Sequence, residues 1–132
     1  MSYRLQKNEI LRGHAAFAAI FGEGKIILEP PLRVFFVVRP DRNPGVQIGF
    51  AVTRRYRSAV DRNRLKRLMR EAYRLKKRNF VENVKACRKA VDMVLLFAAY
   101  SKNGDSMISL TAVEKSIESI TQRIVREIGD AV

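Results

Sequence analysis

The sequence predicts an α+β fold, a single-domain sandwich with the element order α-β-β-α-β-α. Segments with helical spacing of apolar residues alternate with short runs of β-branched and aromatic residues. The length of 132 residues suits one domain, and hydrophobic residues make up 47% of the chain, enough for a packed core. No internal repeat and no interdomain linker interrupts this pattern, so residues 1–132 are expected to form one domain.

The first predicted helix spans residues 14–21 (HAAFAAIF) and has about two turns. The segment is rich in alanine, and Phe17, Ile20 and Phe21 fall on one helical face. Glycines follow it and end the helix. The preceding residues 1–10 are polar and are expected to be flexible.

Two strands are predicted next, at residues 32–38 (LRVFFVV) and 46–53 (VQIGFAVT). Pro30 and Pro31 exclude a helix before the first strand. The polar link between the strands is short and dense in turn residues, which predicts a β-hairpin. Gly49, inside the second strand, predicts a bulge or a close approach of another chain segment.

Residues 54–78 are the most charged segment and also have a helical pattern. They include twelve basic and two acidic residues, so they carry +10 of the formal net charge of +13. Ser58 and Asp61 fit a capping box, and no Pro or Gly occurs before Gly104, so the helix is expected to reach about Asn83. Helical spacing places an apolar stripe on one side: Leu65, Leu68, Met69, Ala72 and Leu75. The opposite side carries Lys66, Arg67, Arg70, Arg74, Lys77 and Arg78.

The last two elements are a strand at residues 90–98 and a C-terminal helix. The strand is apolar almost throughout, which is typical of a strand covered on both faces. Thr111 and Glu114 fit a second capping box. Five apolar residues then repeat at helical spacing and should cover the sheet: Val113, Ile117, Ile120, Ile124 and Ile128.

The concentration of positive charge predicts a polyanionic partner. Solvated helical faces usually mix charges of both signs, whereas residues 54–78 contain nine arginines and three lysines. Arginine binds phosphate through a planar fork and stacks on bases. Nucleic acid is therefore the expected partner.

Composition also excludes several classes of function. No apolar run approaches the roughly 20 residues of a membrane span, and residues 1–10 lack the apolar core of a secretory signal. A cytoplasmic protein without membrane contact is expected. One cysteine, Cys87, and one histidine, His14, provide neither an intrachain disulfide nor a zinc site. No catalytic triad, carboxylate pair or Gly-rich phosphate loop occurs, so no catalytic residue, protein-bound metal or small-molecule substrate is expected.

Residues 62–74 contain a longer motif, Arg-Asn-Arg-x-Lys-Arg-x-x-Arg-Glu-Ala-Tyr-Arg. The sequence Gly-Phe-Ala-Val-Thr-Arg-Arg precedes it at residues 49–55, followed by Ala59 and Val60. In this combination the chain resembles the protein subunit of bacterial ribonuclease P. Weaker similarity extends over residues 11–128, including the pattern Phe17-x-x-Ile20-Phe21-x-x-Gly24.

The resemblance implies a fold and a function. The family's fold is an α+β sandwich with a left-handed βαβ crossover at the basic helix, although general packing rules favour a right-handed one. The implied function is that of a subunit of the endoribonuclease that matures the 5′ end of precursor tRNA. The implied partners are the ribonuclease P RNA and precursor tRNA. In that family the RNA subunit holds the active site and the Mg²⁺ ions, so no cofactor is expected on the protein.

The resemblance also assigns roles to individual residues. The basic helix would bind the catalytic RNA through Arg62, Asn63, Arg64, Lys66, Arg67, Arg70 and Arg74. A cleft between the first helix and the sheet would hold the single-stranded 5′ leader, lined by Phe17, Phe21, Phe36, Thr53, Arg54 and Arg55. By spacing alone, the two aromatic residues of the first helix are more often core residues. Only one of Phe35 and Phe36 can face the cleft, because successive side chains of a strand alternate between faces.

Two positions depart from the family's pattern, and two other functions stay open. Arg57 stands where the family usually has Gly, and Ala98 where it often has a basic residue, which Lys102 could replace. The residues alone also allow a ribosomal or other structural RNA-binding protein, or a DNA-binding domain with the basic helix in the major groove. The aromatic pair favours single-stranded RNA over duplex DNA.

Overall fold

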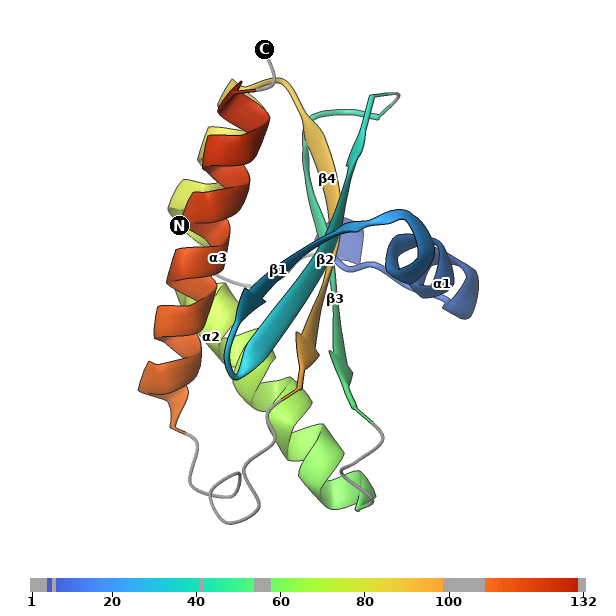
Figure 1. Ribbon diagram of the computed structural model, residues 1–132, viewed down its shortest axis with the longest axis vertical. Helices are drawn as coiled ribbons and strands as arrows, with labels where there is room; N and C mark the ends of the chain where they lie inside the picture. Colours follow the sequence, from blue (N-terminus) through green and yellow to red (C-terminus); the bar gives the residue numbers. More distant parts are fainter. Residues whose placement is uncertain (1–4, 6, 41, 54–57, 99–108, 131–132) are drawn as a thin grey trace.

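The computed structural model describes residues 5, 7–40, 42–53, 58–98 and 109–130, which form an α+β sandwich of three layers (Figure 1). The elements are the 3-10 helix η1 (Lys7–Glu9), α1 (His14–Glu23), β1 (Lys25–Glu29), β2 (Leu32–Arg39), β3 (Gly45–Val52), α2 (Ala59–Ala86), β4 (Ala90–Phe97) and α3 (Leu110–Asp130). One four-stranded sheet lies in the middle. α2 and α3 cover one of its faces, and α1 lies on the other (Figure 1). The predicted α+β class is confirmed.

The strand order is β1-β2-β4-β3, so the predicted hairpin between β2 and β3 is wrong. β2 pairs antiparallel with β1 and β4, and β3 pairs parallel with β4. β4 therefore lies between the two strands that were expected to pair. Seven of its eight residues are buried. An interior position in the sheet lets this apolar strand bury the side chains of both its faces, which an edge position would not.

β1 is one strand more than the predicted order contains. It pairs with β2 from Lys25↔Phe36 to Glu29↔Leu32. Only Ile27 of β1 is buried, whereas Ile26 and Leu28 are exposed. A short edge strand with charged ends lacks the alternating apolar pattern on which strand prediction depends.

The βαβ unit implied by the family resemblance is present. β3 and β4 are adjacent, parallel, and joined in sequence through α2. The hand of this crossover stays a prediction.

The buried residues form two clusters, one on each face of the sheet. The larger cluster lies between the sheet and the pair α2 and α3, and the smaller one lies beneath α1. The five residues of the predicted α3 stripe are all buried in the larger cluster. The predicted cap of α3 at Thr111 is wrong, because the helix starts earlier, and Ser109 Oγ accepts a hydrogen bond from the Ala112 N–H at 3.2 Å.

α2 begins and ends close to its predicted limits. Ser58 is the N-cap, and its Oγ accepts a hydrogen bond from the Asp61 N–H at 3.4 Å. In the predicted apolar stripe Leu65, Met69 and Ala72 are buried, but Leu75 is 42% exposed. The buried stripe instead continues through Tyr73, Lys77, Phe80 and Val84.

Lys77 was predicted on the side of α2 opposite the apolar stripe, and this placement is wrong. Its side chain is buried, and its Nζ donates hydrogen bonds to both carboxylate oxygens of Glu9 at 2.9 Å. Burial, with the nearby Glu9 charge acting in the same direction, raises the pKa of Tyr73, which therefore stays neutral. A carboxylate contributed by η1 thus permits a cation on the core side of α2, which helical spacing could not predict.

The segment before α1 is attached to the sheet, and the flexibility expected for residues 1–10 stays a prediction. Lys7–Glu9 forms η1, Ile10 makes a parallel bridge to Ile48, and the Leu11 N–H donates to the Ile48 carbonyl at 2.9 Å. Residues 1–4 and 6 lie outside the described part of the chain. The segment covers part of the outer edge of β3.

Candidate nucleic-acid interface

The predicted RNA-contacting residues of the basic helix all lie on α2, between residues 62 and 74. We call them the basic face: Arg62, Asn63, Arg64, Lys66, Arg67, Arg70 and Arg74. Five of them are exposed, and Arg62 and Arg74 are half-buried. The helix positions them because Leu65, Met69 and Ala72 fix its opposite side on the core.

Part of the basic face is held by neighbouring groups. The Arg74 guanidinium donates to both carboxylate oxygens of Glu71, at 2.6 and 3.1 Å. This hydrogen bonding lowers the pKa of Glu71, so the pair is fully ionised at neutral pH. The guanidinium carbon of Arg70 lies 5.7 Å from the centre of the Phe50 ring, a cation–π distance that orients Arg70.

Other cations of the basic face lack such partners. Arg64, Lys66 and Arg67 form no ion pair with any residue of the described part of the chain. All three are exposed and lie within two turns of the helix. Exposed cations without an ion-pair partner are suited to bind phosphates of a nucleic acid.

Aromatic rings meet on the opposite side of the sheet, where α1 lies. The rings of Phe17 and Phe21 have centres 6.4 Å apart and lie edge to face, and Phe21 and Phe35 are 4.9 Å apart at 86°. Phe21 is 39% exposed, Phe17 is half-buried and Phe35 is buried. An unpaired base could stack on the exposed ring without any hydrogen bond that reads its identity.

Phe36 was predicted to join these rings, and the structure places Phe35 there instead. Phe36 is 2% exposed and packs in the larger cluster on the α2 and α3 face. Phe35 belongs to the smaller cluster beneath α1. Strand alternation held a signal for this choice: Leu32, Val34 and Phe36 form a wholly apolar face that suits the larger cluster, whereas Phe35 shares its face with Arg33 and Arg39.

At Gly49, a side chain of α1 packs closely on the sheet. A Cβ atom at this residue would lie 2.4 Å from Cζ of Phe17. β3 pairs with β4 without interruption on both sides of Gly49, so there is no bulge. Of the two alternatives predicted for Gly49, the close approach is confirmed, and the Phe17 ring is what approaches.

A row of residues beside α1 continues this face of the sheet. We call it the sheet row: Leu28, Arg33, Leu96 and Ala51, which are paired across all four strands. Arg33 lies two residues before Phe35 and therefore on the same face. Leu28 is 57% exposed and the other three are half-buried, so α1 leaves this row partly open.

Thr53 directly follows the last residue of β3, at the end of the sheet where the sheet row lies. Its N–H donates to the Phe97 carbonyl at 3.2 Å, and its buried Oγ1 has no hydrogen-bond partner among the described residues. The predicted partners Arg54 and Arg55 lie outside the described residues, as do Arg57 and Lys102. Ala98 follows β4, and its N–H donates to the Pro31 carbonyl at 3.0 Å.

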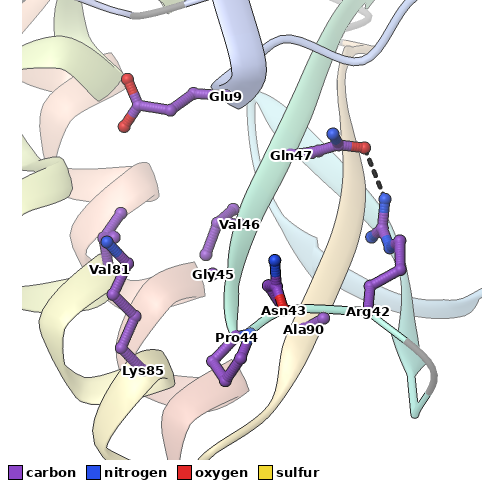
Figure 2. Close-up of a pocket in the computed structure, with 10 residues that line it drawn as sticks. All are labelled: Glu9, Arg42, Asn43, Pro44, Gly45, Val46, Gln47, Val81, Lys85 and Ala90. Carbon is purple, nitrogen blue, oxygen red and sulfur yellow. Dashed lines mark hydrogen bonds between the residues drawn. The ribbon is translucent and has the colours of Figure 1, made fainter.

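A pocket of about 510 Å³ lies at the other end of β3, between the start of that strand, η1 and the C-terminal part of α2 (Figure 2). Two of its charged side chains, Glu9 and Arg42, are engaged within the protein. Glu9 binds Lys77, and Arg42 donates to Gln47 at 2.6 Å and also contacts the buried carboxylate of Asp92. These contacts hold the segment before β3, which is a structural role.

Two further features are absent from the described residues. No group of three or more His, Cys, Asp and Glu side chains lies close enough to hold a metal ion. None of the described helices combines the length and apolar character that crossing a bilayer requires.

A family model and several related sequences match this chain, and all of them name ribonuclease P. The family model described as Ribonuclease P matches residues 5–125. The ribonuclease P protein component of Chlorobium phaeobacteroides is 46% identical over 78 residues, which are 55% of this chain and 53% of that protein. That of Exiguobacterium is 38% identical over 81 residues, 61% of this chain and 64% of that protein. The chain thus spans less than two thirds of the length of these two relatives.

A longer match and two solved structures extend the comparison. The ribonuclease P protein component of Chlorobaculum tepidum is 33% identical over 129 residues, 92% of this chain and 82% of that protein. The RNase P protein of Thermotoga maritima superposes with a TM-score of 0.65 at 25% identity, covering 87% of this chain and 96% of that one. The RNase P protein of Staphylococcus aureus, at 16% identity, has a TM-score of 0.62 over 88% of this chain and 94% of that one, which supports the fold.

Proposed function

The chain belongs to the ribonuclease P protein family, and on this basis we propose that it is the protein subunit of a ribonuclease P ribonucleoprotein. In this function it acts in the cytoplasm with a catalytic RNA on precursor tRNA. The RNA supplies the active site and the Mg²⁺ ions that cleave the 5′ leader. The protein contributes binding, and none of its side chains takes part in bond cleavage.

The observation that carries this proposal is the set of uncompensated cations on α2. Arg64, Lys66 and Arg67 project from one rigid helix that is anchored by buried residues. Binding a phosphate to each would release condensed counterions from the RNA, which favours association at low salt. We assign the basic face to the catalytic RNA.

The second surface is assigned to the single-stranded 5′ leader of precursor tRNA. Phe17, Phe21 and Phe35 provide rings on the α1 side of the sheet, and Thr53 lies at the end of β3. α2 packs on the opposite face of the sheet from α1, so the two surfaces can engage two RNAs at once (Figure 1). The protein then acts as a joint between catalytic RNA and substrate.

Such a joint should lower the Mg²⁺ concentration that cleavage requires. Two RNAs repel each other, and protein cations placed between them screen this repulsion as Mg²⁺ would. The test combines the protein with a ribonuclease P RNA and a 5′-labelled precursor tRNA at low Mg²⁺. Release of the 5′ leader should be faster with the protein than without it.

A variant of the same helix provides a matched control. Arg64→Glu should abolish most of the stimulation, whereas Lys76→Glu, an equal change of charge on α2 outside the basic face, should retain it. If the protein binds the correctly folded RNA but never stimulates cleavage, the proposal is wrong and a structural RNA-binding role is favoured. Preferential binding of duplex DNA would favour the third alternative.

A further inference from the structure

We propose that Arg33 recognises a guanine base in the single-stranded leader and so gives this protein a sequence preference. The inference rests on the proposed function, because it assigns the surface beside α1 to the leader. Stacking on Phe17 and Phe21 accepts any base, so any selectivity must come from a group that forms hydrogen bonds to base edges. The structure points to one such group.

Arg33 is placed where a base next to the aromatic rings would lie. It stands in the sheet row, paired with Leu28 on one side and Leu96 on the other. Phe35, two residues further along β2, carries the ring that contacts Phe21 at 4.9 Å. Side chains two residues apart on a strand share one face, so Arg33 is a direct neighbour of this aromatic cluster on β2.

The hydrogen-bonding capacity of Arg33 is unused. Its Nε is buried and has no partner, and no ion pair joins its guanidinium to any residue of the described part of the chain. Among the described residues, the other buried side-chain atom without a partner is Thr53 Oγ1, which belongs to the same end of the sheet. Buried polar atoms are nearly always paired in folded proteins, and a site for a ligand is one recognised reason for an exception.

The surroundings of Arg33 favour a base over a phosphate. Leu28, Leu96 and Ala51 make the rest of the sheet row apolar, a surface on which a base can lie flat. Among the described residues, the cations of the basic face lie on α2, which packs on the other face of the sheet. Guanine presents two acceptors, O6 and N7, that match the arginine fork, and an unpaired base exposes this edge.

The test measures how the reconstituted holoenzyme binds precursor tRNAs that differ at one leader position at a time. Guanosine should be preferred at one position by about tenfold, the range of a good bidentate contact. Replacing that guanosine by 7-deazaguanosine, which lacks N7, should remove most of the preference. This arm uses only the unaltered protein and does not depend on the folding of a variant.

A variant then assigns the preference to the residue. Arg33→Met keeps an unbranched side chain but removes the guanidinium, and it should abolish the guanosine preference while leaving the affinity for mature tRNA unchanged. Uniform weakening with all leaders, together with a salt slope reduced by about 1, would show a phosphate contact and overturn the inference. A flat leader profile for the unaltered protein would also overturn it.

The two proposals fail in different ways. If the protein stimulates cleavage at low Mg²⁺ but shows no guanosine preference, the role of Arg33 is wrong and the proposed function stands. If it does not stimulate cleavage at all, the proposed function is wrong, and the assignment of Arg33 is wrong with it.

Discussion

The Phe17 ring of α1 packs against Gly49 so closely that no side chain larger than a hydrogen atom fits at this residue. In Gly49→Ala the new methyl group would lie 2.4 Å from Cζ of Phe17, so the ring must move outward. We expect the free energy of unfolding to fall by about 1–3 kcal/mol, the usual effect of overpacking. The affinity for a leader-bearing substrate should fall as well, because the displaced ring belongs to the leader surface. Denaturant unfolding and substrate binding measure the two effects.

Gly22 provides the matched control for that substitution. It lies on α1, and a Cβ atom there would meet no atom within 4 Å. Gly22→Ala should therefore stabilise the protein slightly, by up to roughly 1 kcal/mol, because alanine favours helix. If both variants unfold at the same denaturant concentration, the Phe17 ring is not tightly held against the sheet.

The buried ion pair between Lys77 and Glu9 connects α2 with the segment before α1. The side chains of Lys77 and Glu9 are 9% and 21% exposed, so Glu9→Gln leaves a cation in the core without its countercharge. The free energy of unfolding should decrease by about 3 kcal/mol. Adding Lys77→Met to Glu9→Gln should restore much of the lost free energy of unfolding, because neither charge of this pair remains.

The exposed pair of Arg78 and Glu82 on the same helix is the control. Its side chains are 46% and 64% exposed and 3.5 Å apart. Glu82→Gln should change the free energy of unfolding by less than about 0.5 kcal/mol. Equal effects of Glu9→Gln and Glu82→Gln in urea unfolding would contradict the structural role assigned to the buried pair.

At the scale of the element, α2 divides into a core side and a basic face with different sensitivities. Arg64→Ala with Arg67→Ala removes two exposed cations that have no ion-pair partner among the described residues. Binding to the catalytic RNA should weaken, and the slope of log affinity against log salt should become shallower by about 2, while thermal stability stays unchanged.

A cation elsewhere on α2 tests whether position or total charge matters. Lys76 is exposed and faces the groove between α2 and α3. Lys76→Ala should leave the salt slope unchanged if only the basic face meets RNA. A slope that depends only on the number of cations removed would indicate nonspecific binding by the whole surface.

At the scale of the molecule, the sheet separates the two proposed RNA surfaces. Phe17 belongs to the cluster beneath α1, and α2 packs on the opposite cluster. Phe17→Ala should therefore weaken binding of leader-bearing precursor tRNA and leave mature tRNA and the catalytic RNA bound as before. In the same binding assays, the double variant Arg64→Ala with Arg67→Ala should weaken binding of the catalytic RNA and leave the contribution of the leader to substrate binding unchanged.

The stability of Phe17→Ala distinguishes a core role of Phe17 from a role in leader binding. If this variant unfolds at room temperature, Phe17 is a core residue, which is the role that its spacing alone favours. If it stays folded but weakens every ligand equally, the two surfaces are not independent and the joint proposed for the molecule is wrong.

The sequence was sufficient for features that depend on local spacing or charge. The α3 stripe from Val113 to Ile128, the cap at Ser58 and the exposed cations of the basic face were all predicted. Each follows from residues within a few turns of one helix, where periodicity fixes the face that a residue occupies. The tight contact at Gly49 was one of two alternatives predicted, since a glycine inside a strand indicates either a bulge or a close approach.

Only the tertiary structure decided which elements pair and which residues distant in sequence meet. The order β1-β2-β4-β3 places β4 between two strands that are close in sequence. Lys77 is buried because Glu9, 68 residues away in sequence, comes to meet it. These outcomes depend on contacts between distant residues, and the burial and charge that a residue experiences in them are not encoded in its neighbours along the chain.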